Sequence, residues 1–380
     1  MLAYIVRRLI TIPFLLLGVA SVSFMLSQMT KGDPLAALLP ERMMANPEVV
    51  AAVKAEWGLD QPLPVRYVVY LGKLVQGDLG TSFATRRPVM TDIAERLPAT
   101  LELVIAAMIV GTVLGLLLGL LSARLRGTFL DSLARIFALI GSSLPIFWSG
   151  LILLYILSVR FQVVPGTGRL PPRMQPPPTH TGFYTIDALI AGDFSLFLQV
   201  LSHLALPAFV LGWAVTGIIT RIVRSSLIEG LGQDYARTAR AKGAPERVVL
   251  INHALPNAMI PLLTILGFTF AYLITGAVLT EAIFSWPGIG SYAVRAAASL
   301  DYPAIGGVTI VGSVAFLLAN LLTDIAYAWA NRGSRCTEWP TRPPPPPRPC
   351  AAAASTGRAG CSPACRSPPG SGRCCCFSGC

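Results

Sequence analysis

The stretch ATLELVIAAMIVGTVLGLLLGLLSA, residues 99–123, decides the fold class, because Glu102 is its only ionisable residue. A helix of about 20 apolar residues crosses the roughly 30 Å hydrocarbon core of a bilayer. Further stretches have this length and character: 9–29, 136–159, 203–222, 258–281 and 304–329. We therefore expect an all-α membrane protein with about six transmembrane helices.

The composition of the 380-residue chain is typical of a membrane protein and excludes a soluble globular domain. Hydrophobic residues make up 53% of the chain and charged residues only 13%. The net charge of +11 does not indicate a nucleic-acid partner, because the segment from Asn331 onward, with seven Arg and one acidic residue, supplies +6 of it. The rest lies mostly in short loops between apolar stretches, so the expected partner is the lipid bilayer and not nucleic acid.

The short loops predict the orientation, because Lys and Arg collect on the cytoplasmic side of a membrane protein. Basic residues precede the first apolar stretch and follow the second and the fourth: Arg7, Arg8, Arg124, Arg126, Arg135, Arg221, Arg224, Arg237, Arg240, Lys242 and Arg247. Both termini are therefore predicted to be cytoplasmic. A signal peptide is the alternative for the N-terminal run, but the run continues through Pro13 to about Met29 without a convincing cleavage site, which favours a retained first span.

Small residues and prolines within the stretches predict how the helices pack. One face of the 99–123 stretch has a glycine at every fourth position: Gly111, Gly115 and Gly119. Such a stripe permits close approach of a neighbouring helix, although Gly is also simply common in membrane helices. Pro145, Pro207 and Pro261 are predicted to kink their spans, since the ring removes a backbone donor.

The loop after the fourth stretch is the most informative segment. It reads DYARTARAKG over residues 234–243 and continues to HALPN over residues 253–257. The first part is typical of a short amphipathic helix that ends at Gly243, and a second helix is predicted from about Pro245. We call residues 234–257 the elbow. A basic loop could lie on anionic lipid, but the alanines and Tyr235 between the charges favour a helix that docks in the groove of a protein partner.

At these residues the chain resembles the membrane-spanning subunits of ABC importers. Their cytoplasmic signature has Glu-Ala-Ala, then Gly four residues after the last Ala, then Leu-Pro after a further eleven. This spacing is kept here by Ala239, Gly243, Leu255 and Pro256. Departures from the generic signature occur at Arg237, Thr238 and His253, but the whole string is similar to that of the dipeptide, oligopeptide and nickel branch.

The resemblance covers nearly all of residues 1–330. Further segments are similar to the first of the two permeases in such systems: GLDQP at 58–62, GDLGTS at 77–82, LPATLEL at 97–103 and FSWPGIG at 284–290. It implies a type I transmembrane domain that pairs with a second homologous permease, two cytosolic ATPase subunits and an extracytoplasmic substrate-binding protein. It also implies an ATPase-coupling site made of Asp234, Tyr235, Arg237, Ala239, Lys242, Gly243, Leu255 and Pro256.

The sequence contains no Gly-x-x-x-x-Gly-Lys-Ser/Thr phosphate loop, so we expect a non-catalytic subunit that binds no cofactor directly, with ATP bound on the partner subunits. The resemblance implies that Gly243 permits the sharp turn of the elbow and that Ala239 allows close approach to the ATPase.

Peptides are the favoured cargo, with nickel, glutathione and similar solutes left open. The rival classes are an ion-coupled secondary transporter and a membrane-embedded enzyme, which would need midplane charges or convergent His, Asp or Glu.

Three segments are expected along the chain. Residues 1–98 form the first helix and an extracytoplasmic cap, residues 99–330 form the transmembrane domain with the coupling loop 221–257, and residues 331–380 form a disordered tail rich in Pro, Arg and Cys. All eight cysteines lie in the tail. We interpret it as a frame-shifted read-through, with a metal-binding tail as the alternative. No catalytic, cofactor-binding or metal-ligating residue is expected, and the isolated His180, His203 and His253 are interpreted as structural.

Overall fold

The structure is a computed structural model that describes residues 2–29, 61–172 and 174–330, and in these ranges every regular element is a helix. Residues 30–60, which belong to the predicted extracytoplasmic cap, and the 331–380 tail lie outside the described residues. The elements are α1 (Leu2–Met29), α5 (Leu63–Val75), α6 (Val89–Arg124), α7 (Phe129–Ser143), α8 (Ile146–Leu153), the π-helix η1 (Leu154–Arg160), α9 (Tyr184–Ile190), α10 (Phe194–Gly232), α11 (Asp234–Ala241), α12 (Glu246–Val248), the π-helix η2 (Val249–Ala254), α13 (Leu255–Ile283), α14 (Ile289–Ala298) and α15 (Tyr302–Ala330).

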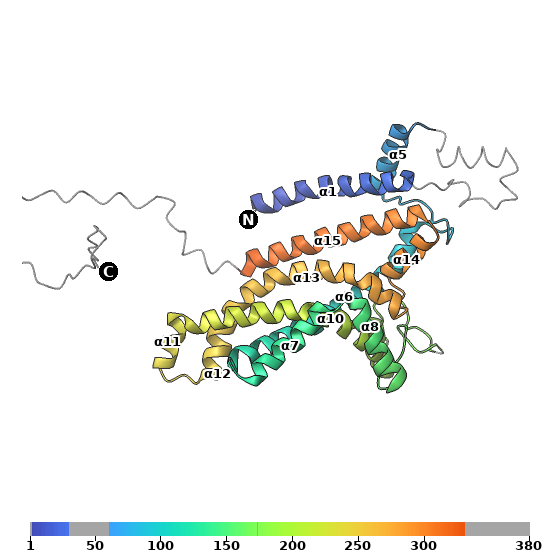
Figure 1. Ribbon diagram of the computed structural model, residues 1–380. Coiled ribbons are helices and arrows are strands. Elements are labelled where there is room, and N and C mark those ends of the chain that lie inside the picture. The colour runs from blue at the N-terminus through green and yellow to red at the C-terminus, as the bar shows by residue number, and fades with distance from the viewer. Residues whose placement is uncertain (1, 30–60, 173, 331–380) are drawn as a thin grey trace, which may run out of the picture. The chain divides into compact units, whose positions relative to one another are not determined.

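All six predicted apolar stretches are helical, which confirms the all-α membrane class. Within the described ranges, four continuous helical segments are long and apolar enough to span a bilayer: Val89–Arg124, Phe194–Gly232, Glu246–Ile283 and Tyr302–Thr323. The pair of α7 with α8 and η1 passes the same test as one bent span, and α1 contributes the shorter apolar helix Ile10–Met25. Figure 1 shows α1, α15, α13 and α10 stacked as successive long helices, and each contacts the next.

The predicted 136–159 span is bent at Pro145, as expected, but more sharply than a kink within one helix. The chain turns by 108° between α7 and α8. The residue before a proline is driven out of the α region by the proline ring, and Leu144, which precedes Pro145, has an extended backbone with ψ 139°. Pro145 therefore separates two helices, whereas Pro207 and Pro261 lie inside α10 and α13.

Two predicted boundaries also need correction. Helix α10 runs over 39 residues, so it begins before the predicted 203–222 span and replaces the first part of the predicted 221–257 loop. Side chains project outward from a helix. Polar residues such as Gln199 and Arg224 therefore end an apolar window in the sequence without ending the helix. Helix α6 likewise begins at Val89, ten residues before the apolar stretch.

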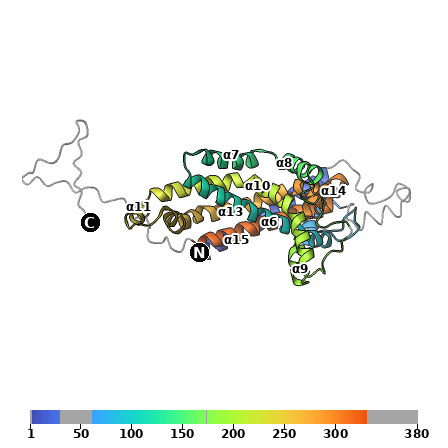
Figure 2. The same cartoon turned by 90° about the horizontal axis from the view of Figure 1, so that it is seen from below.

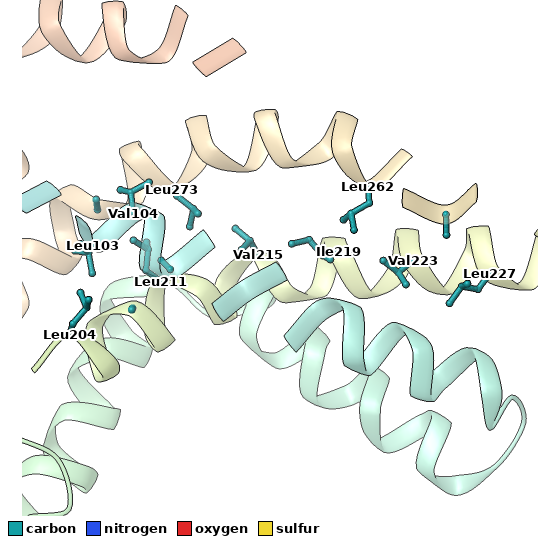
Figure 3. Packing of buried hydrophobic residues seen from close by; sticks show 14 of the residues in the cluster. Leu103, Val104, Leu204, Leu211, Val215, Ile219, Val223, Leu227, Leu262 and Leu273 are labelled. Carbon is teal, nitrogen blue, oxygen red and sulfur yellow. The ribbon is translucent and has the colours of Figure 1, made fainter. Parts of the chain in front are cut away.

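The glycine stripe packs α6 directly against α10, which confirms the predicted close approach. A Cβ atom added to Gly111 would lie 2.6 Å from the carbonyl oxygen of Gly212, and one added to Gly115 would lie 2.5 Å from the side chain of Ile219. These positions therefore admit only glycine without a shift of the neighbouring helix. Figure 3 shows Val215, Ile219 and Val223 following one another along the same helix in the main buried cluster.

Helix α10 lies at the centre of the bundle and contacts α6, α7 and α13 (Figure 2). At its C-terminal end, the buried carboxylate of Asp131 accepts hydrogen bonds from the hydroxyl of Ser122 and, at 3.1 Å, from the guanidinium of Arg224. This contact joins the arginine-rich ends of α6, α7 and α10. Two of the segments that were predicted to be cytoplasmic, the loops after α6 and after α10, thus lie at the same end, which we call the inner end.

Candidate coupling site

The elbow lies at the inner end, between the two most central spans. It begins directly after α10, includes α11 and α12, and passes through η2 into α13. A helix of 39 residues is roughly 58 Å long, so the elbow is separated by the whole length of α10 from the opposite, outer end. Figure 1 shows α11 and α12 projecting at one side of the bundle and α14 near the other.

Helix α11 has a buried face and an exposed face. The side chains of Ala236 and Ala239, 0% and 7% exposed, pack against Val249, with Leu231 and Ala244 around them. The small size of these alanines is thus explained by packing within the chain. The close approach that the sequence suggested at Ala239 is made to η2 and the end of α10, and the face available to a partner is the charged one.

The turn at Gly243 has the geometry that the sequence predicts. Its φ of +82° lies in the left-handed region that favours glycine. The N–H of Gly243 donates to the carbonyl of Arg240 at 2.9 Å, and the N–H of Ala244 donates to that of Ala239 at 3.1 Å. This pair of bonds is a Schellman motif and ends α11. A Cβ atom added to Gly243 would meet nothing within 4 Å, so the space beside it is open to a partner.

The exposed face of α11 carries three of the predicted site residues. The side chains of Asp234 and Arg237 are 97% and 74% exposed and lie 3.6 Å apart, and Lys242 is exposed at the C-cap. Such solvated pairs contribute little to stability. Their charges are therefore free to interact with a partner.

Tyr235 lies back against the end of α10. A Cβ atom added to Gly230 would lie 2.7 Å from the hydroxyl of Tyr235. Leu255 and Pro256 stand apart from α11, in the first turn of α13, where Leu255 packs against the main buried cluster and Pro256 is exposed. Proline suits this position because the first turn needs no backbone donor. The structure thus gathers six of the eight predicted residues in α11 and its cap, and places the other two beyond η2.

Sequence reasoning missed the contact between Arg240 and Glu246 within the elbow. The Nε of Arg240 donates to the Glu246 carboxylate at 2.6 Å, and its Nη1 donates to the carbonyl of Leu231 at 2.9 Å. The two charged residues are six positions apart and belong to different helices, so no helical spacing could reveal the pair. Only the turn at Gly243 brings them together.

Two of the other family-like segments meet at the outer end. The hydroxyl of Thr100, in the 97–103 segment, donates to the Glu281 carboxylate at 2.5 Å and accepts from the N–H of Ile289 at 2.8 Å. The indole of the fully buried Trp286 donates to the carbonyl of Ala99 at 2.8 Å. These contacts fasten the 284–290 loop to α6.

A buried ion pair extends this arrangement to the loop before α9. Arg169 pairs with Glu102, and its guanidinium lies 3.5 Å from the centre of the Tyr184 ring. Glu102 also accepts from the N–H and the hydroxyl of Thr185, both at 2.8 Å. We call Thr100, Glu102, Arg169, Glu281 and Trp286 the outer network. Arg169 lies between two predicted spans, and no pattern in the sequence marks it as a partner of Glu102.

The adjoining helix α9 contains a second buried carboxylate, that of Asp187. It accepts hydrogen bonds from the N–H of Thr181 at 2.8 Å, the hydroxyl of Thr181 at 2.7 Å and the N–H of Gly182 at 2.9 Å. Burial alone would raise the pKa of Asp187, but the bonds from Thr181 and Gly182 outweigh it and lower the pKa below its usual value. Within the described ranges, no group of three His, Cys, Asp or Glu residues is arranged to hold a metal ion.

Several known bacterial proteins are similar to this chain over most of their length. It is 42% identical to the probable D,D-dipeptide transport system permease protein of Escherichia coli (strain K12), over 82% of this chain and 91% of that protein. It is 40% identical to a dipeptide transport system permease protein of Alkalihalophilus pseudofirmus, over 87% and 98%. It is 42% identical to a di/tripeptide transport system permease protein of Pseudomonas aeruginosa, again over 87% and 98%.

Family models match nearly all of the chain outside the tail. The model of the inner membrane component of binding-protein-dependent transport systems matches residues 115–335. The model of the N-terminal part of such membrane components matches residues 1–104. The first match includes the elbow, and the two matches together include both halves of the outer network. The chain therefore belongs to the family of inner membrane components of binding-protein-dependent transport systems.

Proposed function

We propose that this chain is the permease subunit of an ATP-driven importer of di- or oligopeptides, and that its elbow receives the ATPase. The observation that carries the proposal is the two-sided elbow. Its alanine face is packed into the chain, and its charged face and the open side of Gly243 point away from it. The peptide cargo is supported by the names of the relatives, which are dipeptide and di/tripeptide permeases.

The proposed complex contains a second homologous permease, two cytosolic ATPase subunits and an extracytoplasmic binding protein. This chain binds no cofactor itself, and ATP is bound on the ATPase subunits. When those subunits close, they displace the elbow. Because α11 packs on the end of α10 and on η2, which leads into α13, the displacement reaches two spans at once. Movement of these spans would open the path alternately to the two sides of the membrane.

An ion-coupled carrier is the alternative and is not favoured. Such carriers place ionisable groups near the membrane midplane, where they bind the coupling ion. The buried carboxylates of Glu102 and Glu281 lie near the outer end, and fixed donors from Arg169 and Thr100 already engage them. They are placed to hold the fold together rather than to exchange an ion.

The apolar cavity between α1, α6, α13 and α15 is not proposed as the peptide path. Its volume is about 620 Å³, and its walls are mainly apolar, with residues such as Leu15, Ile274, Val308 and Phe316. A dipeptide has two charged ends. Burying a neutral polar group without a hydrogen-bond partner already costs on the order of 2–7 kcal/mol, and burying an unpaired charge costs far more. A path for such a solute needs polar walls, which in the proposed complex would come from both permeases.

The test of the coupling site compares two glycines with the same local structure. Gly243 ends α11 and Gly192 follows α9, each with a positive φ, the same pair of backbone bonds and open space at the Cβ position. Aspartate at either position has a similar backbone cost, about 1 kcal/mol. Only Gly243→Asp, however, places a carboxylate on the proposed docking face. The tagged permease is expressed with its partner proteins, and the amount of co-purified ATPase per permease is measured together with peptide uptake.

We expect Gly243→Asp to leave membrane insertion unchanged and to reduce both ATPase co-purification and uptake to background. Gly192→Asp should retain both. Normal ATPase co-purification with Gly243→Asp would contradict the coupling site. Equal losses in both variants would show that the cost comes from the strained turn and not from docking.

A further inference from the structure

We propose that Arg240 is a positioning residue that fixes the angle of the elbow, so that ATPase closure is transmitted to α10 and α13 rather than absorbed within the elbow. The inference rests on the proposed function of the elbow. Arg240 does not belong to the predicted docking residues, and it acts through the helices that it joins.

Three elements meet at the Arg240 guanidinium. Its Nε and Nη2 donate to the two oxygens of Glu246, at 2.6 and 3.4 Å, and Nη1 donates to the carbonyl of Leu231 at 2.9 Å. Arg240 belongs to α11, Glu246 to α12 and Leu231 to the last turn of α10. The side chain of Arg240 therefore links the two helices of the elbow to each other and to the end of the span that precedes them.

The contact with Leu231 uses a backbone acceptor that the helix itself leaves open. The last four carbonyls of an α-helix have no intrahelical partner, and basic side chains near a C-terminus satisfy them. At Leu231 the basic side chain comes from the next helix, α11. Movement of α11 away from α10 would break this bond, which couples the position of α11 to the end of the span.

Apart from the two backbone bonds that end α11, the corner between α11 and α12 is held mainly by a small apolar cluster. The link over residues 242–245 contains Gly243, the residue type with the greatest backbone freedom. The apolar cluster beneath the corner consists of the small side chains of Ala236, Ala239 and Ala244 with Val249 and Leu231. A cluster of alanines buries little area, so it gives only a weak restraint on the angle between the two helices.

The geometry of Arg240 distinguishes it from an ordinary surface ion pair. Isolated exposed pairs contribute almost nothing, but bidentate arginine–carboxylate contacts within a network are the exception. The planar guanidinium presents five donors in a fixed arrangement, and three of them are used here, two toward the Glu246 carboxylate and one toward the Leu231 carbonyl. Lysine retains the charge but not this arrangement. The side chains of Arg240 and Glu246 remain 37% and 69% exposed, so their replacement should not unfold the membrane domain.

The experiment measures transport per ATP hydrolysed in the complete complex, reconstituted into liposomes with its binding protein and radiolabelled alanyl-alanine. We expect Arg240→Ala to retain complex assembly and ATP hydrolysis and to lower the transport per ATP about fivefold, within the range by which residues along a coupling route alter coupling. Arg240→Lys should fall between Arg240→Ala and the unchanged protein. Arg126→Ala, at an exposed position in the loop after α6, is the neutral control.

A reversed pair separates the two contacts of Arg240. In Arg240→Glu combined with Glu246→Arg, the ion pair can reform, but the bond to the Leu231 carbonyl is lost. Recovery of part of the transport per ATP, relative to Arg240→Glu alone, would show that the ion pair acts as proposed. The absence of any recovery would overturn the part of the proposal that concerns Glu246.

The outcomes distinguish failure of the inference from failure of the proposed function. Transport per ATP that is unchanged in Arg240→Ala would overturn the inference, while loss of the ATPase from Gly243→Asp would still support docking at the elbow. Loss of complex assembly in Arg240→Ala would also overturn the inference, because Arg240 would then be a docking residue. Retention of the ATPase by Gly243→Asp would contradict the proposed docking of the ATPase at the elbow.

Discussion

The outer network and the elbow are both built from segments that resemble the same family, yet they use their polar residues in opposite ways. The outer network buries Thr100, Glu102, Glu281 and Trp286 and pairs each of them with a hydrogen-bonding group inside the chain. The elbow turns its charges to solvent and buries only alanines and a few aliphatic side chains. A family motif can therefore mark either a contact that maintains the fold or a surface kept for a partner, and burial tells the two apart.

The difference has a physical basis in the surroundings of each region. The outer network lies against membrane-spanning helices, where an unpaired polar group is costly and each donor must find an acceptor. The elbow projects beyond the spans, where water satisfies its charges. Changes in the outer network should therefore affect folding before function, and changes in the elbow should affect function before folding.

The largest expected effect is that of Trp286→Ala. The change removes a fully buried indole and its bond to the Ala99 carbonyl, and large-to-small changes of this kind cost about 3–5 kcal/mol. We expect a marked fall in the thermal midpoint of the detergent-purified protein, followed by fluorescence-detected size-exclusion chromatography. Trp148→Ala, at a position that is 48% exposed, is the matched control and should change the midpoint little. Similar midpoints for the two variants would refute the structural role of the outer network.

Much of this comparison could be predicted from the sequence, because some signals are local. Apolar length predicted the spans, and the glycine repeat predicted the packing of α6. Gly243 predicted the turn at the end of α11, since only a left-handed residue closes this motif. A kink at Pro145 was predicted as well, but not its sharpness, because an apolar window does not show that Leu144 is extended.

The remaining features depend on contacts between distant residues. Arg169 reaches Glu102 across 67 positions, and Thr100 reaches Glu281 across 181. No periodicity encodes such pairs. Ala239 was recognised from its spacing, but its partner could not be: the same alanine fits the groove of another protein and the surface of η2 equally well, and only the fold places it against Val249.

A pair of leucine substitutions sharpens the distinction between the two faces of α11. Ala239→Leu overfills the buried face and should cost about 1–3 kcal/mol, whereas Ala241→Leu, at an exposed position, should change stability by about 0.5 kcal/mol or less. Hydrogen exchange of the α11 amides in the isolated permease should therefore accelerate only in Ala239→Leu. Equal exchange in both variants would contradict the inward packing of Ala239.

The smallest effect concerns the loop that holds Arg169, and it depends on pH. Because hydrogen bonds lower the folded-state pKa of Asp187 below its unfolded value near 3.9, Asp187 contributes stability above that value and loses it as the pH falls through the folded pKa. Each unit by which the pKa is lowered corresponds to about 1.4 kcal/mol. Asp187→Asn should therefore lower the thermal midpoint at pH 7, with a difference that shrinks toward pH 3.

Thr181→Val removes one donor to the Asp187 carboxylate, the hydroxyl bond of 2.7 Å, and leaves the two backbone N–H donors in place. Since the hydroxyl is one of the groups that lower the pKa of Asp187, its loss should raise that pKa and move the acid-induced loss of stability to higher pH. A pH profile of the thermal midpoint that is identical in Thr181→Val and the unchanged protein would show that the backbone donors alone hold the carboxylate. In that case backbone bonds and packing would fix the outer end, as they fix the buried face of α11. The contrast between the outer network and the elbow would then be limited to the ion pair of Arg169 and the contacts of Thr100.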